Sequence, residues 1–140
     1  MLRQVLFLGR MRIDHSHDVV SGADSSPTVV YIDRRIPQYS RRLKDKRGQP
    51  ANLWKYLSVH ETTEAKAMAG GMSYDKAHTN IATPAERKAV EADGVSWKAY
   101  TDEIDGYLDR IEREKPTNPP PKGEHVNPEA AIGHYRRRGK

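Results

Sequence analysis

The helix that the sequence predicts most clearly has three ionisable side chains in the middle of its apolar face. It covers residues 53–69, and apolar side chains recur along it at spacings that stack on one face: Leu53, Trp54, Leu57 and Met68. His60, Glu61 and Glu64 fall within the same face. The opposite face carries the side chains of a solvated surface: Lys55, Thr62, Thr63 and Lys66. Burying one imidazole and two carboxylates costs several kcal/mol unless something compensates them, and a bound cation does so directly.

The chain contains no cysteine, so a metal site must be built from His, Asp and Glu. His60 and Glu64 are four residues apart, which places their side chains on adjacent turns of one helical face. Glu61 is turned by about 100° around the helix axis, so it can reach a water on the metal without being a ligand. This is the logic of the H-E-x-x-H zinc motif, in which the glutamate is the general base. Here Glu64 replaces the second histidine, and carboxylate oxygen is an accepted zinc ligand.

His78 is the best candidate for a third ligand. Ser73 can cap a helix with these residues on its apolar face: Tyr74, Ala77, His78, Ile81 and Ala82. The turn at Gly70-Gly71 lets this helix fold back against the first. Two histidines and one glutamate with a water form an open zinc site of catalytic type, and another divalent metal can take the same ligands. We therefore expect His60, Glu64 and His78 to hold Zn²⁺ and Glu61 to be the catalytic base.

An alternative interpretation needs no metal. His60 can be a buried histidine that pairs with Glu64, and His78 can belong to the core or to the surface. The coincidence of these residues with Glu61 on the apolar faces of two adjacent predicted helices favours the metal site.

Two neighbouring residues have more than one possible role. Tyr74, one turn before His78, can pack against it or donate a hydrogen bond to an oxyanion. Glu86 is the last residue of Thr83-Pro84-Ala85-Glu86, which has the pattern of a capping box and so predicts a fresh helix start. The capping role explains Glu86 fully. The alternative is that Glu86 contacts one of the histidines that bind the metal.

The expected fold is a small α+β domain over residues 28–114, with three or four helices packed on a short sheet or hairpin. The best strand candidate is residues 28–37, which are rich in β-branched and aromatic side chains. Because few other strands are expected, this strand should lie at or near a sheet edge. Residues 38–50 are expected to form a basic loop. Further helices are predicted from Thr83 to Asp93 and from Ser96 to about residue 114.

The two flanking segments differ in composition from the middle of the chain. We expect residues 1–27 to be an N-terminal extension with a short strand at residues 4–8, and residues 115–140 to be a flexible, Pro-rich tail. The tail holds six Lys or Arg against two Glu, which is +4 of the net charge of +5. Arg136, Arg137 and Arg138, like a second basic cluster within residues 34–47, can contact nucleic acid or another polyanion. A solvated surface is the favoured interpretation, because aromatic side chains do not alternate with these charges.

Together these motifs resemble a set of small phage and bacterial proteins of zincin-like type. The resemblance covers about residues 29–107 and rests on the strand and on these motifs: H-E-x-x-E at 60–64, Tyr74-x-x-x-His78, Ala82-Thr83-x-x-Glu86 and Asp93-Gly94-x-x-Trp97. It implies a minimal metallopeptidase whose active-site helix packs beside an edge strand. It also implies His60, Glu64 and His78 as metal ligands and Glu61 as base. The chain departs from the usual zincin pattern at Glu64, where histidine is normal.

These features predict a zinc-dependent hydrolase that cleaves an acyl bond in a peptide or protein substrate. An edge strand at residues 28–36 would hold an extended peptide by main-chain pairing. The competing interpretation is a non-catalytic structural or binding module of phage or mobile-element type, whose basic tail contacts nucleic acid or a partner protein. No apolar run approaches the roughly 18 residues needed to span a bilayer, so no membrane partner is expected. The expected location is the cytoplasm, or the host cytoplasm or virion if the protein is phage-encoded.

Overall fold

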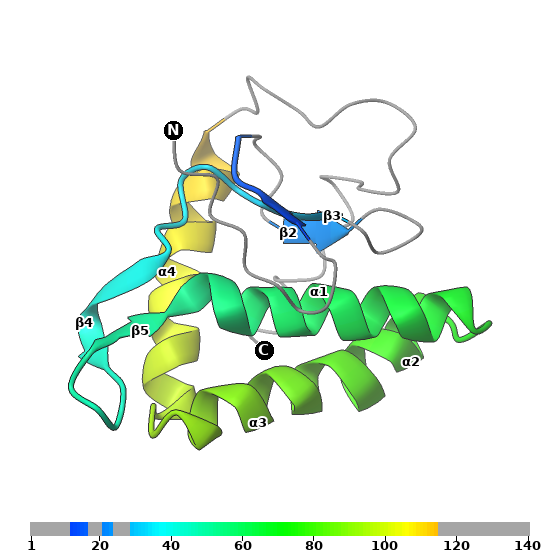
Figure 1. The fold of residues 1–140 in the computed structure, drawn as a ribbon. Coiled ribbons are helices and arrows are strands. Elements are labelled where there is room, and N and C mark those ends of the chain that lie inside the picture. Colours follow the sequence, from blue (N-terminus) through cyan, green and yellow to red (C-terminus); the bar gives the residue numbers. More distant parts are fainter. Residues whose placement is uncertain (1–11, 17–20, 24–28, 115–140) are drawn as a thin grey trace.

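The computed structural model describes residues 12–16, 21–23 and 29–114, and these form a small α+β fold. The strands are β1 (Arg12–Asp14), β2 (Ser21–Ala23), β3 (Val29–Ile32), β4 (Tyr39–Lys44) and β5 (Pro50–Asn52). The helical elements are α1 (Leu53–Ala69), α2 (Tyr74–Lys76), the π-helix η1 (Ala77–Ala82), α3 (Thr83–Ala92) and α4 (Trp97–Arg113). Helix α1 lies between the sheet on one side and the η1–α3 segment on the other, so it is the central element of the fold (Figure 1).

Strand β3 is the central strand of a three-stranded sheet with the order β1-β3-β2. It pairs in parallel with β1 and antiparallel with β2. The prediction of an edge strand at residues 28–37 is therefore wrong, because both sides of β3 are taken by short strands from earlier in the chain. The strand predicted at residues 4–8 lies outside the described residues.

A two-stranded hairpin of β4 and β5 spans residues 39–52, where the sequence predicted a loop over residues 38–50. Its pairing is antiparallel and irregular between Tyr39 and Lys44. The Ser40 hydroxyl accepts hydrogen bonds from the backbone N–H groups of Arg42 and Leu43 and donates one to Glu103 of α4 at 2.6 Å. This buried serine thus ties the hairpin to α4.

Helix α1 begins and ends where the sequence predicts. The Asn52 side chain accepts a hydrogen bond from the backbone N–H of Lys55 at 3.1 Å, which is an N-cap. The helix ends at Gly70, and Gly71 follows with φ of +99°. The predicted faces need two corrections: Met68 is 42% exposed, and Thr62 is buried. Thr62 is covered because α1 packs on two sides rather than one, and Met68 lies in the last turn of the helix.

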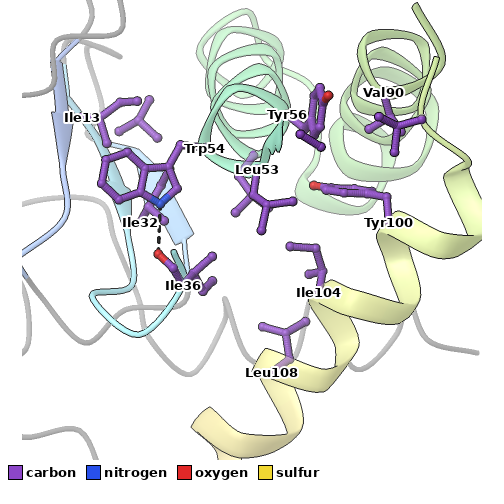
Figure 2. Packing of buried hydrophobic residues seen from close by; sticks show 14 of the residues in the cluster. Ile13, Ile32, Ile36, Leu53, Trp54, Tyr56, Val90, Tyr100, Ile104 and Leu108 are labelled. Atoms are coloured by element: carbon purple, nitrogen blue, oxygen red, sulfur yellow. Dashed lines mark hydrogen bonds between the residues drawn. The ribbon is translucent and has the colours of Figure 1, made fainter. Parts of the chain in front are cut away.

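The hydrophobic core lies on both sides of the first two turns of α1 (Figure 2). Leu53 and Tyr56 point toward α4, where the Tyr100 ring packs edge-on against Tyr56 with centroids 5.3 Å apart. Trp54 lies on the sheet side, and its indole N–H donates to the carbonyl of Ile36 at 3.0 Å. The helix that carries His60 is therefore held firmly at its N-terminal end.

Residues 74–92 form one uninterrupted helical segment, in which α2 leads into η1 and η1 into α3. The predicted break at Thr83 is wrong. Thr83 has helical angles (φ −63°, ψ −45°), and no side chain caps the start of α3. Pro84 would crowd the carbonyl four residues before it in an ordinary helix, and the wider π-helical turn lies directly before this proline.

Helix α4 begins as predicted. The Ser96 hydroxyl accepts from the backbone N–H of Ala99, and the buried stripe is Tyr100, Ile104, Leu108 and Ile111. Of the neighbouring residues Tyr107 and Leu108, Leu108 is buried and Tyr107 is only partly buried. This stripe places Tyr100 against the other helices.

Candidate metal centre

Three side chains from two neighbouring elements meet at one point inside the protein. His60 and Glu64 come from α1, and His78 comes from η1. The His60 Nε2 atom lies 3.1 Å from Glu64 Oε2 and 3.1 Å from His78 Nδ1, and His78 Nδ1 lies 3.2 Å from Glu64 Oε2. The three residues are buried. The two predicted helices thus do fold back on each other and bring these side chains together.

Hydrogen bonds alone cannot join all three atoms of this triangle. A neutral imidazole nitrogen either donates or accepts, and an ionised carboxylate only accepts. With Glu64 ionised, at most two of the three contacts can therefore be hydrogen bonds at one time. A cation between the three atoms can contact a lone pair on each of them.

The triangle also has the dimensions that a zinc ion requires. Ligand atoms of a tetrahedral zinc ion lie about 3.3 Å apart when the metal–ligand bonds are about 2.0–2.1 Å long. The three observed separations, 3.1, 3.1 and 3.2 Å, are close to this value. The donor set of two imidazole nitrogens and one carboxylate oxygen is also one that zinc accepts. The residues present therefore fit a divalent metal ion.

The other ring nitrogen of His60 is held by a second carboxylate. His60 Nδ1 lies 2.8 Å from Glu86 Oε1 of α3, and Glu86 is fully buried. An ionised carboxylate only accepts, so Nδ1 carries the proton and Nε2 faces Glu64 and His78. Burial would lower the pKa of His60, but hydrogen bonds to Glu64 and Glu86 outweigh it and raise that pKa to about 10. The buried carboxylates thus favour a positive charge at this place.

Glu86 is therefore not the helix cap that the sequence predicted. It lies inside a helical segment that continues across Thr83, and its second oxygen accepts a hydrogen bond from the Tyr100 hydroxyl at 2.6 Å. The contact with His60, predicted as the alternative, is the one that the structure shows. The contact of Tyr100 with Glu86 was not predicted from the sequence. Its available signal was a tyrosine on the apolar face of a predicted helix, since a buried tyrosine hydroxyl needs a hydrogen-bond partner.

His78 is presented by the π-helix η1. The backbone N–H of Thr83 donates to the His78 carbonyl, five residues back, in place of the usual four. Tyr74 lies alongside, with its ring nearly parallel to that of His78 (8°) and the centroids 5.9 Å apart. Turns of this kind occur often at functional sites in other proteins.

One side of the triangle reaches the protein surface. The side chains of Glu64 and His78 each keep 11% of their area exposed, whereas the His60 side chain has none. Catalytic zinc sites keep one coordination position open, and structural sites are closed by four protein ligands. Within the described residues the group has three ligands.

Glu61 is next to His60 in sequence and is buried in α1. Its carboxylate contributes to the raised pKa of His60, so the two groups interact electrostatically. Glu61 does not belong to the group of atoms that converge on the metal position. The structure thus brings His60, Glu64 and His78 together and leaves Glu61 beside them.

The basic residues named from the sequence divide into two groups. Arg136, Arg137 and Arg138 lie outside the described residues. In the second cluster, Arg35 is bound to Asp33 through two contacts of 2.8 Å and reaches Glu114. The cations of the β4 strand are largely exposed: Arg41, Arg42 and Lys44.

No family model, no curated protein and no solved structure matches this chain. Among the described residues, no helix is long and apolar enough to cross a membrane.

Proposed function

We propose that this protein is a metal-dependent hydrolase in which His60, Glu64 and His78 hold one divalent ion, most simply zinc. The observation that carries the proposal is the triangle of three contacting atoms, which hydrogen bonds can satisfy only in part. Zinc held by two histidines and one glutamate is a ligand set of known hydrolytic enzymes. A zinc ion in such a site lowers the pKa of a water and polarises a carbonyl group.

Glu61 has the role of general base in this proposal. Its position directly after the first ligand histidine is that of the base in the H-E-x-x-H motif. It would accept the proton that the attacking water loses and pass it to the leaving group. The exposed edge at Glu64 and His78 is where a substrate would enter.

An acyl bond, with a peptide as the leading substrate, is the proposed target. Its support is the ligand set and the resemblance to zincin-like proteins. Pairing of the peptide with the strand at residues 28–36 is not part of the proposal, because β3 already has a strand on each side.

Elemental analysis of the purified full-length chain tests the metal site. We expect about one equivalent of zinc in the wild type and a loss of at least tenfold in affinity for His78→Ala. Asn80→Ala is a matched control, because Asn80 lies in the same π-helix and is exposed. Wild-type protein that folds fully without metal and binds no added zinc would refute the proposal.

The role of Glu61 is tested separately from metal binding. Glu61→Gln should keep its zinc and lose hydrolysis of a library of fluorogenic peptides, while Glu91→Gln, an exposed control, should keep both. Zinc binding without hydrolysis in the wild type would instead indicate a non-catalytic metal module.

A further inference from the structure

A chain of buried hydrogen bonds connects α4 to the candidate metal centre. The Tyr100 hydroxyl donates to Glu86 Oε2 at 2.6 Å, and Glu86 Oε1 accepts from His60 Nδ1 at 2.8 Å. Tyr100, Glu86 and His60 are all fully buried. Helices α4, α3 and α1 each contribute one residue, so the chain spans three helices before it reaches the metal position.

Each link of this chain restricts the next one. The imidazole of His60 can present either nitrogen to the metal position, and only the proton on Nδ1 leaves Nε2 as the ligand atom. Glu86 accepts that proton in a hydrogen bond and so selects both the tautomer and the rotation of the ring. The carboxylate of Glu86 can itself rotate, and the Tyr100 hydroxyl holds its second oxygen in place.

We infer that Tyr100 and Glu86 are positioning residues for metal binding, since together they hold His60 with Nε2 turned toward Glu64 and His78. The inference rests on the proposed function and adds that Tyr100, a residue of α4, is needed for full metal affinity. A carboxylate that holds a ligand histidine typically contributes 10–100-fold to metal affinity. Metal affinity should therefore depend on a hydroxyl that does not touch the metal.

Tyr56 provides a matched control for Tyr100. The two rings pack edge-on against each other with centroids 5.3 Å apart, and both are fully buried. The Tyr56 hydroxyl donates to Asp93 at 2.8 Å, and Asp93 also accepts from the Lys55 ammonium group. Within the described residues, Asp93 makes no hydrogen bond to His60, Glu64 or His78. Replacing either tyrosine by phenylalanine removes one hydroxyl from the same ring pair and leaves the packing in place.

The experiment measures the zinc affinity of the full-length protein by competition with a chromophoric chelator, together with the Tm of the metal-free protein. Tyr100→Phe should weaken zinc binding about tenfold, and Glu86→Gln about 10–100-fold. Tyr56→Phe should leave the affinity within about twofold of the wild type, although it also loses a buried hydrogen bond and some stability.

Each outcome separates the inference from the proposed function. If the wild type binds zinc and Tyr100→Phe binds it equally well, the positioning role is refuted and the metal site stands. If Tyr56→Phe loses as much affinity as Tyr100→Phe, the effect is one of general stability and the inference is also refuted. If the wild type binds no zinc, the proposed function fails. Tyr100→Phe decides the question even if Glu86→Gln does not fold, because the phenylalanine variant keeps every buried carbon atom.

Discussion

Replacing Gly94 by alanine should destabilise the protein more than the same change at Gly48. Both glycines have a left-handed backbone, with φ of +77° and +80°. An alanine in that conformation costs about 1–2 kcal/mol at either site. A Cβ at Gly94 would lie 2.8 Å from the Cβ of Lys46, whereas a Cβ at Gly48 would have nothing within 4 Å. The two variants thus share the backbone cost, and they differ in the contact with Lys46, which is close only at its Cβ.

The contact at Gly94 cannot be relieved by a simple movement. The turn of the β4–β5 hairpin is held against the end of α3 by two hydrogen bonds of Lys46, from its backbone N–H to Asp93 at 2.7 Å and from its ammonium group to Ala92 at 2.9 Å. Forcing extra volume into such a contact costs about 1–3 kcal/mol. We therefore expect about 1–2 kcal/mol for Gly48→Ala and about 2–5 kcal/mol for Gly94→Ala.

Chemical denaturation of the two variants measures the difference, and a double-mutant cycle identifies its source. Lys46→Gly removes the Cβ that the new methyl group would meet, so it should couple to Gly94→Ala by at least about 1 kcal/mol. Lys46→Ala keeps that Cβ and should show no such coupling. Equal losses of stability for Gly94→Ala and Gly48→Ala would refute the reasoning, because the packing of the hairpin turn would then contribute nothing.

Three further predictions concern the metal centre and one histidine outside it. Zinc at about 100 times its Kd should raise the stability of the wild type by about 2.7 kcal/mol, measured as a Tm shift that a chelator reverses and that His78→Ala lacks. Deleting Asn80 should leave seven residues from His78 to Glu86, which in an ordinary α-helix keeps the two side chains within about 20° of each other, so this variant should still bind zinc. Deleting Thr79 as well should turn the two side chains about 120° apart and weaken zinc binding, with helical structure kept by circular dichroism. Burial lowers the pKa of His15 below its ordinary value of 6.5, so the unfolded chain takes up this proton first. The free energy of unfolding should therefore fall as the pH drops below about 6.5, and by less in His15→Gln.

The boundaries of α1, the end of α3 and the start of α4 could be predicted because their causes are close in sequence. Asn52 caps the turn that follows it, and Ser96 does the same for α4. Gly94, with its left-handed backbone, ends the helix directly before it. Each of these effects acts over three or four residues, so a short stretch of sequence contains all of the information.

Strand pairing could not be predicted in the same way. β3 is central because it pairs with β1, which lies 17 residues earlier, and with β2. β1, β2 and β5 have three residues each, too few for an alternating pattern to stand out. The irregular pairing of β4 also breaks the alternation of exposed and buried residues that predicts a strand.

The site itself was predictable in part, and Glu86 shows where the limit lies. Glu86 lies eight residues after His78. In an ordinary α-helix, eight residues turn by about 800°, which is two full turns and about 80°, so the two side chains would face different directions. The π-helix takes one extra residue into its turn, which removes about 100° and brings the two side chains to within about 20° of each other. Both then face α1, where His60 contacts each of them. Thr83-Pro84-Ala85-Glu86 has the pattern of a capping box. Because the helix continues across Thr83, however, Glu86 has no N-terminus to cap, and it contacts His60, 26 residues earlier. A local motif and a long-range contact compete for the same residue here, and the register of one turn decides between them.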